Sequence, residues 1–256
     1  MILLIDAGNS SLKWGLLNGD TLEPGGRMIH ERQDVREVAA QAWGQLPVPE
    51  RAVIANVGGD RLAGSLRAWM KRTWRLLPEF PVAGASAAGV TNAYRQPERL
   101  GVDRWAALVA ARHHAGGPAC VVDCGTAITI DVLGADGAHL GGLITPGLRL
   151  MRRSLSAGTR GIGEDGEPPL MQDGQVCLLG RDTQGAVSGG TLYAAVALID
   201  RVLADMREEA GDRISALLTG GDAPTVLPLL AGPIHHRPDL VLEGLAILAR
   251  ETSCAS

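Results

Sequence analysis

A short motif occurs twice in this chain, and the two copies lie almost half the chain apart. LLIDAGNSS begins at residue 3 and CVVDCGTAI begins at residue 120. In each copy an apolar run ends in an aspartate, so that Asp6 matches Asp123 and Gly8 matches Gly125. Coincidence between two Asp-x-Gly turns is the alternative, but similar hairpin patterns also follow both copies. A repeat of this length in 256 residues is typical of a duplicated fold.

Each copy continues into a predicted β-hairpin. Residues 11–18 form the return strand of the first and end at Asn18-Gly19-Asp20, while residues 133–137 hold the matching turn of the second. Further apolar strands are predicted at 52–57 and 214–223, and helices at 31–45, 61–74, 102–114, 184–209 and 239–250. We therefore expect an α/β protein of two similar lobes, residues 1–117 and 118–256, around a central cleft.

Charge and composition exclude several classes of protein. The net charge is −4 and no run reaches about five like charges, which argues against a general nucleic-acid binder. No stretch of about 18 uncharged apolar residues and no basic signal-peptide start occur, so we expect a cytoplasmic protein without a membrane partner. The four cysteines form no CxxC pair, and Cys120 and Cys124 lie in an apolar stretch where they are expected to be core residues.

The first motif, Asp6 to Lys13, has the composition of a phosphate-binding turn. A glycine-containing hairpin directs backbone N–H groups outward, and small polar side chains add further donors for phosphate oxygens. Asp6 at the strand end can organise a hydrated Mg²⁺ ion, and Lys13 can supply positive charge. An ordinary hairpin with a structural aspartate explains this motif equally well when it is taken alone.

The second motif, Asp123-x-Gly125-Thr126, can hold the other side of a polyphosphate by the same chemistry. Two such turns are more specific than one and favour nucleotide phosphate binding. Neither is a Walker A loop, and no GxGxxG follows the first strand, so P-loop and Rossmann sites are disfavoured.

Three further segments stand out. After a strand, Thr219-Gly220-Gly221-Asp222 suits either a stacked adenine or a plain turn with Asp222 as a helix N-cap. Within Gly101 to Arg104, Asp103 can accept a proton and Arg104 can bind a carboxylate or phosphate, although a simple helix start is the alternative. Residues 159–180 are irregular, which predicts a functional or mobile loop.

The chain resembles the type III pantothenate kinases, a family of the actin-like kinase/ATPase superfamily. The segments that carry the resemblance are DAGNSSLK (6–13), NAYRQPERLGVDR (92–104), DCGTAITID (123–131), GGLITPG (141–147) and GRDTQGAVSGG (180–190). It implies two duplicated ribonuclease-H-like lobes with ATP between them. It also implies phosphorylation of the pantothenate hydroxyl at the first step of coenzyme A biosynthesis.

The resemblance also assigns roles to individual residues. Those expected to bind ATP are Asp6, Ala7, Gly8, Asn9, Ser10, Ser11, Leu12, Lys13 and Thr126. Those expected to bind pantothenate are Tyr94, Gly101, Val102, Asp103, Arg104 and Thr183. Asp103 would accept the proton of the hydroxyl, and Arg104 would bind the carboxylate of the substrate. Asp6 would lie near Mg²⁺, directly or through water, and Asp123 would bind K⁺ or NH₄⁺. Family members are homodimers, for which we expect helix 184–209 at the interface.

Two other functions compete with this interpretation. One is a different activity on the same scaffold, such as a sugar or acetate kinase or a polyphosphate-cleaving phosphatase. The other is an accessory role in transcription, which has been described for some members of the family. The intact Gly101 to Arg104 segment and Tyr94 favour the pantothenate kinase. Ser10 replaces the threonine of many members but keeps the hydroxyl group.

Overall fold

The computed structural model describes residues 1–31, 33–159, 162, 171–172, 175–176, 179–210 and 214–254. Their contacts divide the chain into two compact units, and each is described by itself. The first comprises Met1–Gly117, Leu133–Gly141 and Asp239–Ser256, and the second comprises Pro118–Val132 and Gly142–Pro238. The two lobes expected from the sequence, residues 1–117 and 118–256, were defined by the repeat and not by contacts. Their bounds stay a prediction.

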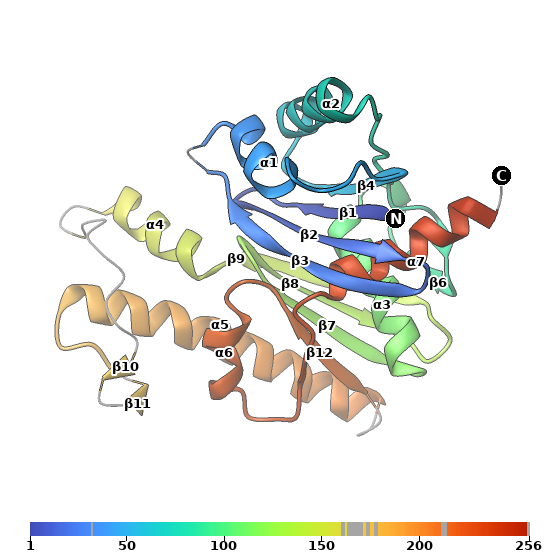
Figure 1. Ribbon diagram of the computed structural model, residues 1–256. Helices are drawn as coiled ribbons and strands as arrows, with labels where there is room; N and C mark the ends of the chain where they lie inside the picture. Colours follow the sequence, from blue (N-terminus) through green and yellow to red (C-terminus); the bar gives the residue numbers. More distant parts are fainter. Residues whose placement is uncertain are drawn as a thin grey trace. The chain divides into compact units, whose positions relative to one another are not determined.

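The first unit is built on a four-stranded sheet (Figure 1). Its strands are β1 (Ile2–Ala7), β2 (Ser11–Asn18), β3 (Thr21–Ile29) and β4 (Arg51–Asn56), in the order β3-β2-β1-β4. β1 runs antiparallel to β2 and parallel to β4. In this register Asp6 lies directly opposite Lys13. The sheet therefore brings the acid and the base of the first motif to neighbouring positions.

Helices cover both faces of this sheet. α1 (Val35–Trp43) and α2 (Asp60–Trp74) pack over one face, where Trp14, Trp43, Trp69 and Trp74 form a chain of edge-to-face contacts. α3 (Val102–Ala115) and α7 (Leu240–Cys254) pack against the sheet and against each other. A Cβ atom at Gly244 would collide with the carbonyl oxygen of Ala106, so glycine permits this close contact. Between α2 and α3 lie β5 (Ser86–Ala87), β6 (Val90–Thr91) and the short helix η1 (Pro97–Arg99).

The second hairpin lies in a five-stranded sheet of order β13-β12-β7-β8-β9. Its strands are β7 (Ala119–Cys124), β8 (Ala127–Leu133), β9 (His139–Pro146), β12 (Ser215–Thr219) and β13 (His235–His236). β12 is parallel to β7, as β4 is to β1. The order β9-β8-β7-β12 thus repeats the order β3-β2-β1-β4, and the predicted α/β fold with a duplicated core is confirmed.

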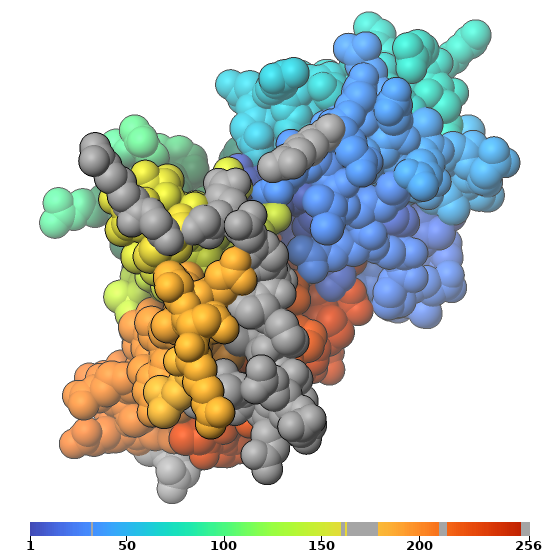
Figure 2. All heavy atoms as spheres, turned by 90° about the vertical axis from the view of Figure 1, so that its left-hand side faces the viewer, coloured from blue at the N-terminus to red at the C-terminus, as the bar shows by residue number. Residues whose placement is uncertain are grey.

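The helices of the second unit follow its hairpin. They are α4 (Leu148–Gly158), α5 (Thr183–Ala210), α6 (Ala223–Val226) and the short helix η2 (Leu227–Leu229), and a small hairpin pairs β10 (Met171–Gln172) with β11 (Gln175–Val176). α4 packs against α5, and both helices reach the surface, where they are yellow and orange (Figure 2). Most of the predicted loop 159–180 lies outside the described residues.

In the described part of the chain, one segment of α5, Thr183–Glu209, is long and apolar enough to cross a membrane by length and composition. The core helix of a soluble protein meets the same criterion. Leu192, Ala195 and Ile199 of α5 are buried in the core of the second unit, and 39% of the apolar segment is buried in all. The absence of a membrane span stays a prediction.

Two cysteines of β7 belong to the same core. Cys120 and Cys124 are buried, as expected from the sequence, and burial raises the pKa of each thiol to about 12. Such thiols stay protonated and unreactive near neutral pH. Cys177 lies outside the described residues.

Candidate active site

The turn between β1 and β2 is held in place by the end of β3. Gly8 N donates to Ser11 O at 3.1 Å, which closes the turn. His30 Nε2 lies 2.9 Å from Gly8 O, and Ser10 Oγ donates to Glu31 Oε1 at 3.0 Å. Asn9 is exposed at the tip. The first motif is therefore a braced turn whose tip faces solvent.

A polar pocket of about 810 Å³ borders this turn. It is lined by His30 and Glu31, by the first turns of α1 and α2, and by Gly58. Arg36 and Arg61 add positive charge to its wall. Glu31 and Asp34 line the same pocket, and the Asp34 side chain caps α1. The two arginines and the N-terminus of α2 are therefore the groups in this pocket that suit an anionic ligand such as a phosphate chain.

Lys13 has an anionic partner that sequence reasoning missed. Its Nζ atom lies 3.0 Å from Asp239 Oδ1, and the two side chains are 26% and 21% exposed. Asp239 comes just before α7, and its carbonyl oxygen accepts the N–H of Glu243. An aspartate before an apolar helix is a recognisable N-terminal signal, but the sequence does not reveal that Lys13 reaches it. The role of Lys13 towards phosphates stays a prediction.

The second unit brings the second and third motifs together. Gly220, at the end of β12, has a φ of +97°, and a Cβ atom there would lie 2.5 Å from Asp123 Oδ1. Asp222 N donates to Cys124 O at 2.9 Å. Asp222 also stands before α6, yet its side chain makes no capping hydrogen bond. The Gly-Gly turn is thus required for the Asp123 carboxylate to lie where it does, and it is more than a helix start.

The turn after Asp123 is one residue shorter than the first, since Gly125 N donates to Ala127 O at 3.1 Å. Gly147 N donates to Thr126 O at 2.9 Å, and a Cβ atom at Gly147 would collide with the carbonyl oxygens of Gly125 and Thr126. Thr126 itself is exposed. The Asp123 carboxylate and the carbonyl oxygens of Gly125 and Thr126 therefore lie at or beside this turn, and oxygen donors of this kind suit a hard cation.

No group of three or more His, Cys, Asp or Glu side chains able to hold a metal ion occurs within the described residues. Asp6 and Asp123 each lie near the end of a strand, just before a turn. A cation that keeps water or takes oxygens from a phosphate fits such a sparse set of donors, whereas a caged metal centre does not.

The predicted acceptor residues meet at the start of α3. Asp103 Oδ1 accepts the N–H of Arg104 at 2.8 Å and lies 2.6 Å from where a Cβ atom of Gly101 would be. Glycine at 101 therefore leaves room for the carboxylate to fold back over the helix start. The N-terminal end of a helix favours the ionised carboxylate.

Arg104 contacts Tyr94 in two ways. Its Nη1 atom donates to Tyr94 Oη at 2.9 Å, and the guanidinium carbon lies 5.8 Å from the centre of the Tyr94 ring. Arg104 is only 7% exposed. Asn92 Oδ1 accepts the N–H of Tyr94, and its Nδ2 donates to the carbonyl oxygens of Gly84 and Pro97. Asn92, which sequence reasoning passed over, therefore shapes the loop that carries Tyr94.

Comparison with known proteins decides the family. The family model for type III pantothenate kinase matches residues 2–205. This chain belongs to the type III pantothenate kinase family. A type III pantothenate kinase of Nitrosococcus oceani is 45% identical to it over 258 residues, which cover 99% of this chain and 95% of that protein. One of Halorhodospira halophila is 39% identical and covers 96% of each chain.

Two solved structures are similar to this chain in fold. A conserved Baf family protein of Campylobacter jejuni superposes with a TM-score of 0.58 at 22% identity, covering 98% of this chain and 99% of that one. The ethanolamine utilization protein EutJ of Carboxydothermus hydrogenoformans has a TM-score of 0.52 at 11% identity, covering 96% and 88%. At these identities the likeness concerns the fold alone.

Two further residues are predicted to bind the substrate of this type III pantothenate kinase, and they differ in burial. Val102 is buried at the start of α3. Thr183 belongs to the second unit, where it is exposed in the first turn of α5, next to Asp182, which accepts the N–H of Gly185 at 2.7 Å. Their contacts with a substrate stay predictions.

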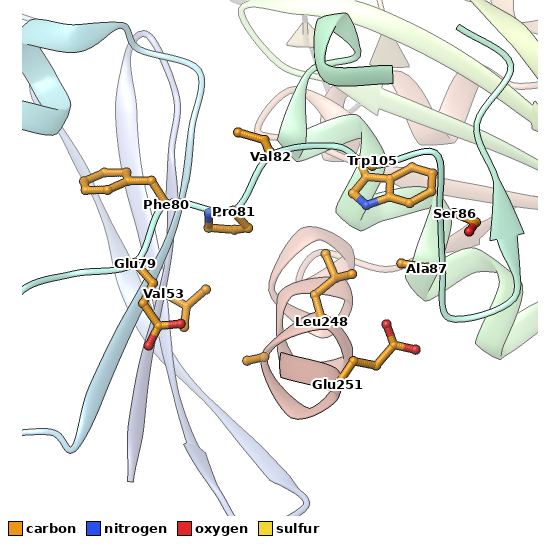
Figure 3. Close-up of a pocket in the computed structure, with 12 residues that line it drawn as sticks. Val53, Glu79, Phe80, Pro81, Val82, Ser86, Ala87, Trp105, Leu248 and Glu251 are labelled. Atoms are coloured by element: carbon orange, nitrogen blue, oxygen red, sulfur yellow. The ribbon is translucent and has the colours of Figure 1, made fainter. Parts of the chain in front are cut away.

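An apolar pocket of about 530 Å³ in the first unit is separate from the predicted residues (Figure 3). It lies between Val53 of β4, the segment 79–87, Trp105 of α3 and Leu248 of α7. None of the residues that line it was predicted to bind ATP or pantothenate. The residues of the candidate active site therefore belong to the polar turns and to the start of α3, and they do not line this apolar pocket.

Proposed function

We propose that this chain transfers the γ-phosphoryl group of ATP to the hydroxyl of pantothenate and so forms 4'-phosphopantothenate at the first step of coenzyme A biosynthesis. The observation that carries the proposal is the buried Arg104–Tyr94 pair beside Asp103, in a member of the type III pantothenate kinase family. A buried cation next to the Asp103 carboxylate suits an acceptor that bears both a carboxylate and a hydroxyl group.

Each acceptor residue has a distinct task in this proposal. Arg104 binds the carboxylate of pantothenate through charge-assisted hydrogen bonds and so fixes the distance to the hydroxyl. Tyr94, Gly101 and Val102 shape the pocket around Arg104, and Thr183 is a further contact for pantothenate. Asp103 accepts the hydroxyl proton. Because the transition state of phosphoryl transfer is loose, this proton leaves late, and an ionised carboxylate at a helix start is a sufficient base.

The two turns bind the nucleotide. Residues Asp6 to Lys13 and Thr126 hold the phosphates of ATP. Asp6 would hold Mg²⁺ directly or through water, and Asp123, with the carbonyl oxygens around it, would hold K⁺ or NH₄⁺. When bound, these cations neutralise charge on the phosphates.

We further propose a cytoplasmic homodimer with α5 at the interface. Tyr193 of α5 is 61% exposed, and Leu150 and Leu155 of the neighbouring α4 are also exposed. Exposed apolar side chains on two adjacent helices support an interface. A second copy of the chain is the partner that the family resemblance implies.

Complementation tests the function most directly. In a bacterium that lacks pantothenate kinase, the wild type should restore growth and Asp103→Asn should not. In purified protein, Asp103→Asn should lower kcat by about 10² to 10⁴ with little change in the KM for pantothenate, because only the proton acceptor is lost. Asp20→Asn, which removes a carboxylate that is 95% exposed in the turn between β2 and β3, is the matched control.

The outcomes separate the alternatives. Rescue by both proteins would exclude Asp103 as the base, and rescue by neither would favour the accessory role in transcription. A panel of acetate, sugars and polyphosphate in place of pantothenate tests the related activities. Faster turnover of any of these would overturn the assignment of pantothenate as the substrate.

A further inference from the structure

We propose that His139 is a positioning residue for the acceptor site and that it holds the ring of Tyr94, and through it Arg104, in place for pantothenate. The inference rests on the proposed function. His139 is the first residue of β9, on the second copy of the hairpin, and nothing in the sequence links it to Tyr94.

The contact between the two rings is the first argument. The His139 imidazole is 3% exposed and stacks on the Tyr94 ring, with 6.1 Å between ring centres and 18° between planes. Tyr94 in turn accepts the hydrogen bond from Arg104 and lies under its guanidinium group. His139, Tyr94 and Arg104 thus form one continuous row of side chains that ends at the residue proposed to bind the substrate carboxylate.

The anchoring of the β8–β9 turn is the second argument. Residues 133–141 belong to the first unit, together with Tyr94 and α3. Thr91 N donates to Gly137 O at 3.1 Å, and Arg112 Nη1 of α3 donates to Ala135 O at 2.9 Å. Gly137 has a φ of +86°, and a Cβ atom there would collide with the carbonyl oxygen of Gly89. The β8–β9 turn therefore packs closely against residues 89–91, which precede Tyr94. This packing places His139 against the Tyr94 ring.

Kinetics provide the first test. Because an aromatic contact of this kind is modest, His139→Ala should raise the KM for pantothenate about three- to tenfold. The KM for ATP should stay within about twofold, since the residues proposed for ATP are not part of the row. His139→Phe keeps a planar ring and should recover most of the loss. Gly137→Ala should resemble His139→Ala, because it displaces the turn. His113→Ala, which removes an exposed imidazole from α3, should change neither constant.

Tyr94 can also be observed without any assay of activity. The chain contains only two tyrosines, and the other, Tyr193, is exposed in the second unit. Protein labelled with 3-fluorotyrosine should show two ¹⁹F resonances, which Tyr193→Phe assigns. His139→Ala should shift the Tyr94 resonance and leave that of Tyr193 unchanged. The retained KM for ATP shows that the variant is folded.

The two tests fail in distinguishable ways. If the wild type does not phosphorylate pantothenate, the proposed function is wrong and the positioning role falls with it. If the wild type is active but the Tyr94 resonance does not move in His139→Ala, the inference about His139 is wrong. Equal increases in both KM values, or no recovery in His139→Phe, would also overturn it. A shifted resonance with a selective rise in the KM for pantothenate supports it.

Discussion

The two copies of the hairpin turn share a backbone design and differ in what surrounds them. The first turn is braced by His30 and Glu31, and Lys13 stands opposite Asp6. The second turn is one residue shorter, which places Thr129 where the first copy has Lys13. Duplication has therefore kept the acid at the end of the strand in both units but the cation in only one. We expect Lys13, which also pairs with Asp239, to serve the first turn and the second turn to depend on a cation from solution.

Removal of each aspartate in turn should break the apparent equivalence of the two copies. Asp6→Asn should lower kcat/KM by about 10³ or more, because the carboxylate expected to organise Mg²⁺ is lost. Asp123→Asn should lower it by about 10 to 10², because a monovalent cation contributes less charge stabilisation than Mg²⁺. Steady-state kinetics on both variants in KCl measure the difference.

Replacement of KCl by NaCl is the control for the Asp6→Asn and Asp123→Asn variants. NaCl in place of KCl should slow the wild type and Asp6→Asn but should not slow Asp123→Asn further. Equal rates of the wild type in both salts would count against a cation site at Asp123. Equal losses in the two variants would mean that the copies have the same role.

Each unit has a Gly-Gly-Asp turn, at residues 58–60 and 220–222, and the two turns can be compared by their effect on the free energy of unfolding. Gly59, after β4, has a φ of +84°, and a Cβ atom there would meet nothing within 4 Å. Gly220, after β12, combines a positive φ with backbone contacts to Cys124. Gly59→Ala should lower the free energy of unfolding by about 1–2 kcal/mol from backbone strain alone. Gly220→Ala should lower it by about 3–5 kcal/mol, because overpacking is added to the strain.

Urea denaturation of the two glycine variants measures this difference, and ATP kinetics add a second reading. Gly220→Ala should also mimic part of the Asp123→Asn defect, since the new methyl group displaces the Asp123 carboxylate. Similar losses of stability in both variants would show that the turn at Gly220 accommodates the added methyl group without a further loss of free energy of unfolding.

The smallest expected effect on stability concerns the segments that border β4 and β12 on the side away from β1 and β7. β12 is bordered by β13, whereas β4 is bordered only at Glu79, through a single bridge to Val53. Arg51 donates to both carboxylate oxygens of Glu79, at 2.7 and 2.8 Å, and this hydrogen bonding lowers the pKa of Glu79 below its ordinary value of 4.5. The pair therefore secures the edge of the first sheet.

The direction of the pH effect follows from the lowered pKa. A carboxylate with a depressed pKa stabilises the folded chain fully above pH 4.5, and this contribution is lost as the pH falls through the folded-state pKa. Because Glu79 is 44% exposed, the effect should stay below about 1 kcal/mol. Glu79→Gln should lower the melting temperature slightly at pH 7, and the difference from the wild type should vanish in acid. A constant difference at all pH values would exclude the ion pair as its cause.

Much of the candidate site could be predicted from the sequence, because its motifs are local. Asp6, Asp103 and Asp123 each stand at the end of a strand or the start of a helix, and such boundaries are visible in the sequence pattern. Asn92 lies in the segment 92–104 that carries the resemblance, but its three hydrogen bonds depend on how the loop folds back on Gly84 and Pro97. Asp239 and His139 lie far along the chain from Lys13 and Tyr94, and no local pattern pairs them.

The sequence by itself determined the duplication, the strand ends that carry the acids, the glycines of the two repeated turns and the family. These features depend on the alternation of apolar residues and on allowed backbone angles, which act over a few neighbouring residues. Only the tertiary structure decided that the tip of the second hairpin packs in the first unit, that Lys13 reaches Asp239 and that His139 stacks on Tyr94. Such contacts arise from long-range packing, in which one surface selects another by shape and charge.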